Sequence, residues 1–210
     1  MKTLKLVLFL GLVLPTYVFP NEIKLKKQNF YKLVVPAINK VYAELDYRYK
    51  TLKTNIEHNN TKSSLVIKYM DMYKAKSYEE LLRKVKPHPK SIAIAQAALE
   101  SGWASSRFTK IANNLFGIWS FNKNEKRVPA LQKRGSKIVY VKKYDKIEDS
   151  IRDYYFVLAT SKSFSDFRKL KMQTNNPHEL VKELDMYSEK RSAYGRDLSK
   201  VISYNKLHNY

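Results

Sequence analysis

Apolar side chains recur at three- and four-residue spacing early in the chain, and this spacing predicts an amphipathic helix. Pro36 lies inside the run and is expected to kink or split the helix, because proline lacks the backbone N–H that an interior turn needs. A polar loop over 55–63 and a second helix over 65–73 follow. The apolar positions of the first helix are Phe30, Leu33, Val34, Ala37, Ile38, Val41 and Leu45.

Ser77 and Glu80 have the spacing of a capping box, which predicts a short helix through Val85. The run from Ser91 to Glu100 is apolar on almost every side and rich in alanine. That composition is typical of a helix buried among other elements. Gly102 should end this helix, because glycine is the usual residue just past a helix end.

Two β-prone runs, 128–132 and 137–144, are joined by the glycine-containing stretch 133–136, and this pattern predicts a β-hairpin with a four-residue turn. Asp145 and Glu148 have capping-box spacing, which favours a helix through residue 158. After the hairpin and this helix, Pro177 should open a further helix, and the last helix is expected over 194–204.

The chain has 210 residues, 44% of them apolar, which suits one domain of ordinary size and excludes a disordered protein. It contains no cysteine, and its four histidines lie far apart, so we expect neither a metal site nor a cofactor. The formal net charge is +21. Such a basic chain could bind nucleic acid, a membrane surface or an acidic polymer.

The first twenty residues bear on that choice. Lys2 and Lys5 precede an apolar run over 6–14, a pattern that predicts a secretory signal peptide over 1–20 and export to the periplasm or the cell exterior. An uncleaved N-terminal anchor is the alternative. Export makes nucleic acid an improbable partner, and no nucleic-acid-binding module is recognisable. We expect no stable membrane insertion once the signal is removed.

Glu100 is the first candidate for catalysis. Burial and the negative end of a helix both raise the pKa of a carboxyl group, and a carboxyl that keeps its proton near neutral pH can act as a general acid. The alternative is an ordinary exposed carboxylate, which the spacing alone favours. Beyond it, aromatic, amide and glycine residues alternate over 102–119, as in sugar-binding clefts or, equally, as in a core with a turn at Asn113–Asn114.

These residues carry a resemblance. The run Ala95-Gln-Ala-Ala-Leu-Glu-Ser-Gly-Trp103, with Ser106-Arg-Phe108 and Asn113-Asn-Leu-Phe-Gly117, resembles the motif of the bacterial glucosaminidase domain, glycoside hydrolase family 73. Within that family the chain is most similar to the Bax-like proteins of Gram-negative bacteria. The resemblance implies an α+β, mainly α fold, with a lysozyme-like helical lobe, a small β-hairpin lobe and a cleft between them. We expect a helical extension over 21–86 and the glucosaminidase domain over 87–210.

The family's activity implies an endo-β-N-acetylglucosaminidase that cleaves the β-1,4 bond after N-acetylglucosamine in peptidoglycan strands. The resemblance places the general acid at Glu100. Glu125 is a candidate for the base that activates water, and an exposed loop carboxylate is its alternative. In a substrate-assisted route the acetamido oxygen of the substrate attacks instead, and Tyr194 would support it. The residues expected to bind substrate are Trp103, Asn113, Asn114, Phe116 and Tyr187.

Two other functions of a protein with this fold stay open. A lytic transglycosylase would leave a 1,6-anhydro product, and a non-catalytic wall-binding protein would release nothing. Residues 123–146 carry nine basic against two acidic side chains and would attract the carboxylates of peptidoglycan. An ordinary solvated surface is the alternative interpretation of this charge. A monomer is expected.

Overall fold

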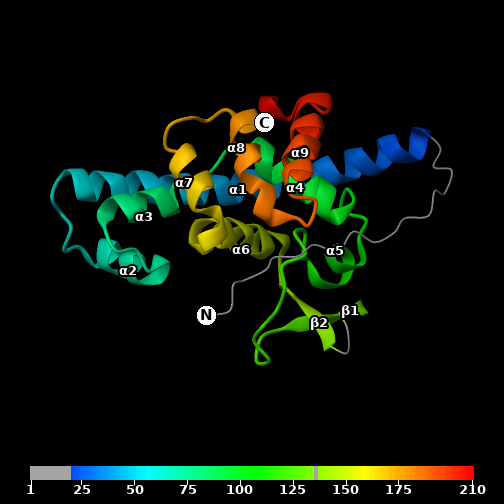
Figure 1. The fold of residues 1–210 in the computed structure, drawn as a ribbon, viewed down its shortest axis with the longest axis horizontal. Helices are drawn as coiled ribbons and strands as arrows, with labels where there is room; N and C mark the ends of the chain where they lie inside the picture. Colours follow the sequence, from blue (N-terminus) through cyan, green and yellow to red (C-terminus); the bar gives the residue numbers. More distant parts are fainter. Residues whose placement is uncertain (1–19, 135–136) are drawn as a thin grey trace.

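The computed structural model describes residues 20–134 and 137–210; the predicted signal peptide therefore lies outside the described residues, except for Pro20. Helices surround the core, and a two-stranded sheet projects from one side (Figure 1). The first helices are α1 (Pro20–Glu57), α2 (Ser64–Tyr73), α3 (Tyr78–Val85), α4 (Lys90–Ser101) and α5 (Arg107–Ala112). After the strands β1 (Arg127–Arg134) and β2 (Lys137–Lys142) come α6 (Ile147–Thr160), η1 (Lys162–Phe164), α7 (Ser165–Leu170), α8 (Pro177–Leu180), η2 (Val181–Tyr187), α9 (Ser192–Tyr204) and η3 (Leu207–Asn209).

Helix α1 runs along the length of the molecule as one helix (Figure 1). The predicted split at Pro36 is wrong, because helical residues continue on both sides of the proline. The predicted apolar face is buried apart from Leu33, which is 49% exposed. Through this face α1 packs on α4 and α6 and shares their hydrophobic core, so residues 30–45 are part of the same packed body.

The far end of α1 packs with α2 and α3 around a second, smaller apolar cluster. The capping prediction at Ser77 is confirmed, since its hydroxyl accepts from the Glu80 N–H and the Glu80 carboxylate accepts from the N–H of Lys76. The N-terminus of α3 is thereby fixed by two short-range hydrogen bonds. The cluster contains Leu52, Val66, Tyr69, Tyr73, Leu81, Val85 and Ala159.

Helix α4 lies in the middle of the fold, as its alanine-rich sequence predicts. Every residue from Ser91 to Ala98 is buried, and the helix packs between α1 and α9. Small alanine side chains let these neighbours approach closely. Gly102 ends the helix in the left-handed conformation with φ 56°, which confirms the predicted stop.

The hairpin lobe is built around β2. One edge of β2 pairs with β1 in antiparallel register, and the other accepts a bridge from Trp119. β1 is thus an edge strand, where Pro129 is tolerated because its missing N–H is not needed by a further strand. The pairing of Arg134 with Lys137 shortens the connection to 135–136, which lie outside the described residues, so the predicted four-residue turn is wrong.

Helix α6 begins without the predicted aspartate cap. Lys146 is the residue at the N-cap position, and no side chain bonds the first turn there. The Asp145 carboxylate instead binds Lys126, at 2.7 Å from its Nζ. An ion pair with a residue 19 positions away has therefore displaced a local cap. The predicted helices at 177 and 194–204 are confirmed as α8 and α9.

The fold class is confirmed as α+β and mainly α, with a helical lobe that carries a small hairpin lobe. Over the two described ranges, none of the helices combines the length and the apolar character needed to cross a membrane.

Candidate functional site

Glu100 lies in the last turn of α4, directly before the turn that ends the helix. That turn is unusual, because Gly102, Trp103 and Ala104 all have positive φ, at 56°, 61° and 60°. Positive φ is disfavoured for residues with a Cβ, so the turn is held by its hydrogen bonds. Ser101 Oγ accepts from the N–H of Ala104 at 2.7 Å, and the N–H of Trp103 donates to Ala98 O at 2.8 Å.

The Glu100 carboxyl group keeps its proton at neutral pH. Burial raises the pKa of Glu100 to about 8, against the smaller opposing effects of the Tyr194 hydrogen bond and the positive charge of Lys190. An acid with this pKa is mostly protonated at pH 7 and still gives up its proton readily, which is the balance that general acid catalysis requires.

Tyr194, from the start of α9, contacts Glu100 directly. Its hydroxyl donates to Glu100 Oε1 at 2.6 Å and accepts from Gln96 Nε2 at 3.0 Å. The ring stacks on Tyr187 of η2, with centroids 5.6 Å apart and planes 7° from parallel. The structure thus brings together three of the predicted site residues, Glu100, Tyr194 and Tyr187.

Gln96 was not identified from the sequence, although a signal was present. It precedes Glu100 by four residues, so the two side chains lie on the same face of α4. A fully buried glutamine next to a candidate acid is a polar group whose partners have to be sought.

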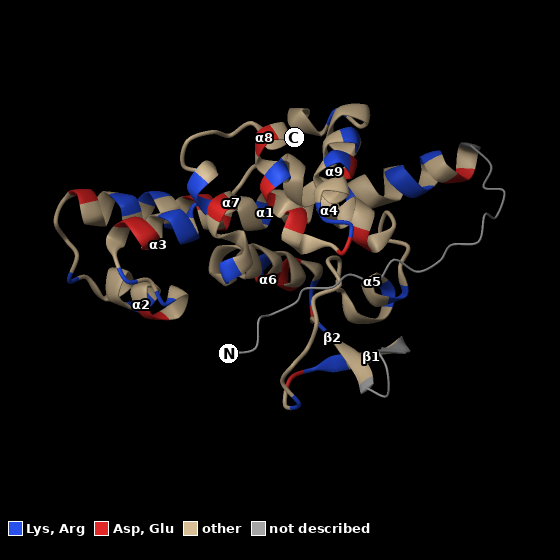
Figure 2. Cartoon of the chain, viewed as in Figure 1, with Lys and Arg blue, Asp and Glu red and all other residues tan. Residues whose placement is uncertain are grey.

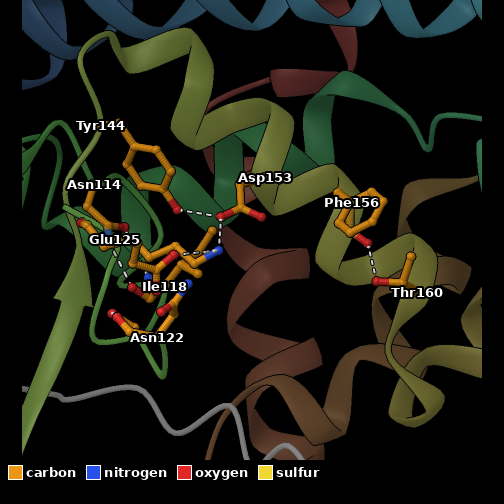
Figure 3. Close-up of polar contacts among 10 residues, drawn as sticks. Asn114, Ile118, Asn122, Glu125, Tyr144, Asp153, Phe156 and Thr160 are labelled. Carbon is orange, nitrogen blue, oxygen red and sulfur yellow. Dashed lines mark hydrogen bonds and ion pairs between the residues drawn. The ribbon is translucent and has the colours of Figure 1, made fainter. Parts of the chain in front are cut away.

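Glu125 lies in the hairpin lobe and belongs to a polar cluster (Figure 3). Its Oε2 is 3.9 Å from Lys142 Nζ, and Lys142 also binds Asp153 of α6 at 2.7 Å. Asp153 accepts a further hydrogen bond from the Tyr144 hydroxyl at 2.8 Å. This cluster fastens the hairpin lobe to α6, and it keeps the Glu125 carboxylate, 28% exposed, beside a cation.

Tyr144, which sequence reasoning missed, joins the two groups of residues. Burial raises the pKa of its phenol well above the usual value, followed by Asp153, with smaller contributions from Glu125 and Tyr187. Tyr187 in turn interacts electrostatically with Glu100. Tyr144 thus interacts electrostatically with Glu125 on one side and with Tyr187 on the other.

The two predicted asparagines support the hairpin lobe. Asn114 is buried, its Nδ2 donates to Ile118 O and Lys142 O, and its Oδ1 accepts from the N–H of Ile118. Asn113 ends α5 with φ 50° and donates to Tyr144 O and Asp145 O. Both amides thus hold the chain segments that enter and leave the strands, and a role in binding substrate stays a prediction.

The remaining aromatic candidates differ in position. Phe116 is fully buried and stacks on Tyr154, with ring centroids 4.0 Å apart. Trp103 packs edge-on against Phe30 of α1 at 5.2 Å and lies under Lys27 Nζ at 4.6 Å. Phe116 is thus part of the core and Trp103 contacts α1, and their predicted roles in binding substrate stay untested. Among the residues that the structure describes, no group of three metal-ligating side chains is found.

The sequence matches the model of the glucosaminidase family, described as mannosyl-glycoprotein endo-beta-N-acetylglucosaminidase, over residues 75–207. It is 26% identical over 135 residues to Protein bax of Escherichia coli strain K12. The aligned region covers 61% of this chain and 47% of that protein. The chain therefore spans about half the length of this curated relative.

A solved structure shows the same fold. The catalytic domain of the autolysin Auto from Listeria monocytogenes aligns with a TM-score of 0.53 at 20% identity, covering 94% of this chain and 99% of that domain. A peptidoglycan hydrolase from Sphingomonas sp. A1 aligns with a TM-score of 0.47 at 25% identity, covering 60% of this chain and 85% of that one.

Proposed function

Because the chain belongs to the glucosaminidase family of glycoside hydrolases, we propose that it is an exported cell-wall hydrolase that acts on peptidoglycan strands. The bond cleaved is the β-1,4 linkage after N-acetylglucosamine. Export rests on the pattern of residues 1–20, and the anionic substrate fits a chain with a net charge of +21.

One observation carries this proposal: a carboxyl group with a pKa of about 8 stands at the end of α4, within 2.6 Å of a tyrosine hydroxyl. Glu100 donates its proton to the glycosidic oxygen as the bond to the anomeric carbon breaks. The leaving sugar departs with a new hydroxyl group, and Glu100 is left as a carboxylate. Lys190 and Tyr194, which both favour the ionised form, stabilise that product of the proton transfer.

The second half of the reaction has two routes. In one, Glu125 takes a proton from a water molecule that attacks the anomeric carbon from the hairpin side. In the other, the acetamido oxygen of the substrate attacks, and water then opens the cyclic intermediate. Glu125 Oε2 lies 3.9 Å from Lys142 Nζ, so in the first route this carboxylate would act while it is paired with a lysine.

Glu125→Ala separates these routes. A loss of kcat on isolated sacculi of more than about a hundredfold is expected if Glu125 is the base, because general bases contribute that much or more. A loss below tenfold would support the substrate-assisted route. Asp145→Ala is the matched control, since it removes an exposed carboxylate from the same lobe that is also paired with a lysine.

The products test the bond that is cut. Sacculi digested with the protein and analysed by mass spectrometry should yield fragments that end in reducing N-acetylglucosamine. Fragments ending in 1,6-anhydro-N-acetylmuramic acid would instead identify a lytic transglycosylase. Binding to sacculi without any released fragment would identify a wall-binding protein and overturn the proposal.

A further inference from the structure

Four polar side chains form a continuous row of hydrogen bonds that ends at Glu100. Tyr154 of α6 donates its hydroxyl hydrogen to Gln96 Oε1 at 2.5 Å. Gln96 Nε2 donates to the Tyr194 hydroxyl oxygen at 3.0 Å, and Tyr194 donates to Glu100 Oε1 at 2.6 Å. Tyr154, Gln96 and Tyr194 are each at most 3% exposed, so water does not compete for these bonds.

The row has a fixed direction, because each hydroxyl carries a single hydrogen. Tyr154 donates its single hydroxyl hydrogen to the carbonyl oxygen of Gln96. This bond holds the amide with its NH₂ group toward Tyr194. The Tyr194 oxygen is then an acceptor from Gln96, so its hydrogen points to Glu100. Glu100 Oε1 is consequently an acceptor, and the carboxyl proton resides on the other oxygen, Oε2.

We propose that Gln96 and Tyr154 are positioning residues that keep the transferable proton of Glu100 on Oε2, away from Tyr194 and free for the substrate. This inference rests on the proposed function, in which Glu100 is the general acid. Tyr154 is three bonds of the row away from Glu100 and touches no reacting atom. It acts by setting which way the Gln96 amide faces.

Removal of the Tyr154 hydroxyl should exchange the donors and acceptors in the hydrogen bonds that Tyr194 makes with Gln96 and Glu100. Without that donor, the Gln96 amide is free to rotate and to present its carbonyl oxygen to Tyr194. Tyr194 then donates to Gln96 and accepts from Glu100, so the carboxyl proton is held between Glu100 and Tyr194. Because the Tyr194 hydrogen bond lowers the pKa of Glu100, its loss raises that pKa further.

The groups that face Glu100 come from three directions. Tyr194 approaches from α9, Tyr187 from η2 and Tyr154 from α6, and Lys190 contributes its charge from the segment between η2 and α9. The three phenols have pKa values raised well above the usual one by burial. Near pH 8, therefore, Glu100 is the member of this set that titrates.

The test is Tyr154→Phe, which keeps the ring that stacks on Phe116 and removes only the hydroxyl. The variant should lose about tenfold in kcat on sacculi at unchanged KM, a fraction of what a general acid contributes. Its activity should also persist to higher pH than that of the unmodified protein. Simple damage to the core would lower kcat without shifting the alkaline decline of kcat to higher pH.

A second substitution makes the prediction sharper. In the double variant Tyr154→Phe with Gln96→Leu, there is no carbonyl oxygen to capture the Tyr194 hydrogen, so Tyr194 points to Glu100 again. The double variant should therefore recover most of the lost kcat. Gln96→Leu alone should also be faster than Tyr154→Phe. If the double variant is as slow as Tyr154→Phe or slower, the positioning role is wrong.

Tyr155→Phe is the matched control. It removes the hydroxyl of the neighbouring buried tyrosine, whose hydroxyl points to His88 O at 3.5 Å and does not reach Gln96. Its kcat and pH profile should equal those of the unmodified protein. Equal behaviour of Tyr154→Phe and Tyr155→Phe would overturn the inference.

A measurement without substrate separates this inference from the proposed function. Carboxyl groups of ¹³C-labelled glutamate can be titrated by NMR, with the Glu100 signal assigned by its absence in Glu100→Gln. The Glu100 pKa should be higher in Tyr154→Phe than in the unmodified protein and should return in the double variant. An unshifted pKa contradicts the row of hydrogen bonds even if the protein hydrolyses peptidoglycan as proposed.

Discussion

At the scale of single residues, the site depends on what burial does to one carboxyl group. Glu100 belongs to a helix whose residues from Ser91 to Ala98 are all buried, and Glu100 itself is partly buried at the end of that helix. The carboxyl accepts a hydrogen bond from the neutral Tyr194 hydroxyl and is also influenced by the charge of Lys190, and both effects are smaller than that of burial. The result is an acid that is protonated under the conditions in which most other carboxyls are ionised.

The pH dependence of kcat follows from that shift. In the proposed mechanism the protonated form of Glu100 is the active one, and its fraction falls as pH rises through about 8. Hydrolysis of sacculi should therefore be constant on the neutral side and decline about tenfold per pH unit above this value. A profile that declines already above about pH 5, where an ordinary glutamate has lost its proton, would contradict the raised pKa.

The raised pKa of Glu100 should also make the free energy of unfolding depend on pH. Between about pH 4.5 and 8 the unfolded chain releases the Glu100 proton while the native state retains it. Unfolding thus releases a proton, and the native state becomes less stable as pH rises through this window. Glu100→Gln removes this effect. The difference between its free energy of unfolding and that of the unmodified protein should therefore increase in favour of the variant from about pH 4.5 to 8 and stay constant above about pH 8. Urea unfolding at several pH values measures it, and a difference that does not grow would speak against a buried neutral acid.

At the scale of elements, the site depends on how closely α9 approaches η2, because α9 carries Tyr194. Gly195 makes this approach possible. A Cβ on this residue would lie 2.6 Å from Val181 O and 3.2 Å from Val181 C, both backbone atoms that cannot rotate away. The contact therefore requires glycine, although glycine is a poor helix former.

Gly195→Ala should destabilise the protein even though it improves helix propensity. The overlap forces α9 away from η2, at a cost of about 1–3 kcal/mol in the free energy of unfolding. Because Tyr194 moves with the helix, kcat should fall as well. Ser203→Ala, at an exposed position of the same helix, is the control and should leave stability unchanged or slightly higher. An equal or raised melting temperature in Gly195→Ala would refute the close packing.

The elements that the sequence predicted correctly are those with local causes. The Ser77 cap, the end of α4 at Gly102 and the helix at Pro177 each depend on residues within four positions. Where a distant residue competes, local reasoning fails. The Asp145 carboxylate pairs with Lys126 and does not cap α6. Pro36 lies within a continuous helix, which packs against α4 and α6.

The candidate site shows the same limit. The Tyr194–Glu100 contact joins residues 94 positions apart, and only a resemblance to a family suggested it. The Tyr154–Gln96 bond spans 58 positions and had no such support. The bonds of Asn114 to the hairpin lobe likewise reach Lys142, so the sequence could not separate a supporting amide from a ligand-binding one.

At the scale of the whole molecule, basic residues are spread over many elements of the fold. Lys and Arg residues are found on α1, α3, α9 and β2, so both lobes are basic (Figure 2). The segment 123–146, which includes the hairpin lobe, has nine basic and two acidic residues. A field of this sign concentrates the protein on an anionic polymer and accelerates encounter.

Salt should therefore slow the protein on its polymeric substrate. The screening length falls from about 10 Å at 0.1 M to about 3 Å at 1 M ionic strength, so hydrolysis of sacculi should drop several-fold over this range. Hydrolysis of a short uncharged N-acetylglucosamine oligomer is the control and should change little. Activity on sacculi that is nearly independent of salt would show that the basic surface does not bind the wall.

The proposed function depends above all on Glu100 as the general acid of a cell-wall hydrolase. Its most direct test is the release of soluble fragments from purified sacculi by Glu100→Gln, compared at pH 7 with the unmodified protein at equal concentration. Glutamine preserves the size of the side chain and can still bond Tyr194, but it has no proton to give. We expect a loss of at least about a hundredfold in a variant that still folds and binds sacculi. Fragment release within a few-fold of the unmodified protein would contradict it.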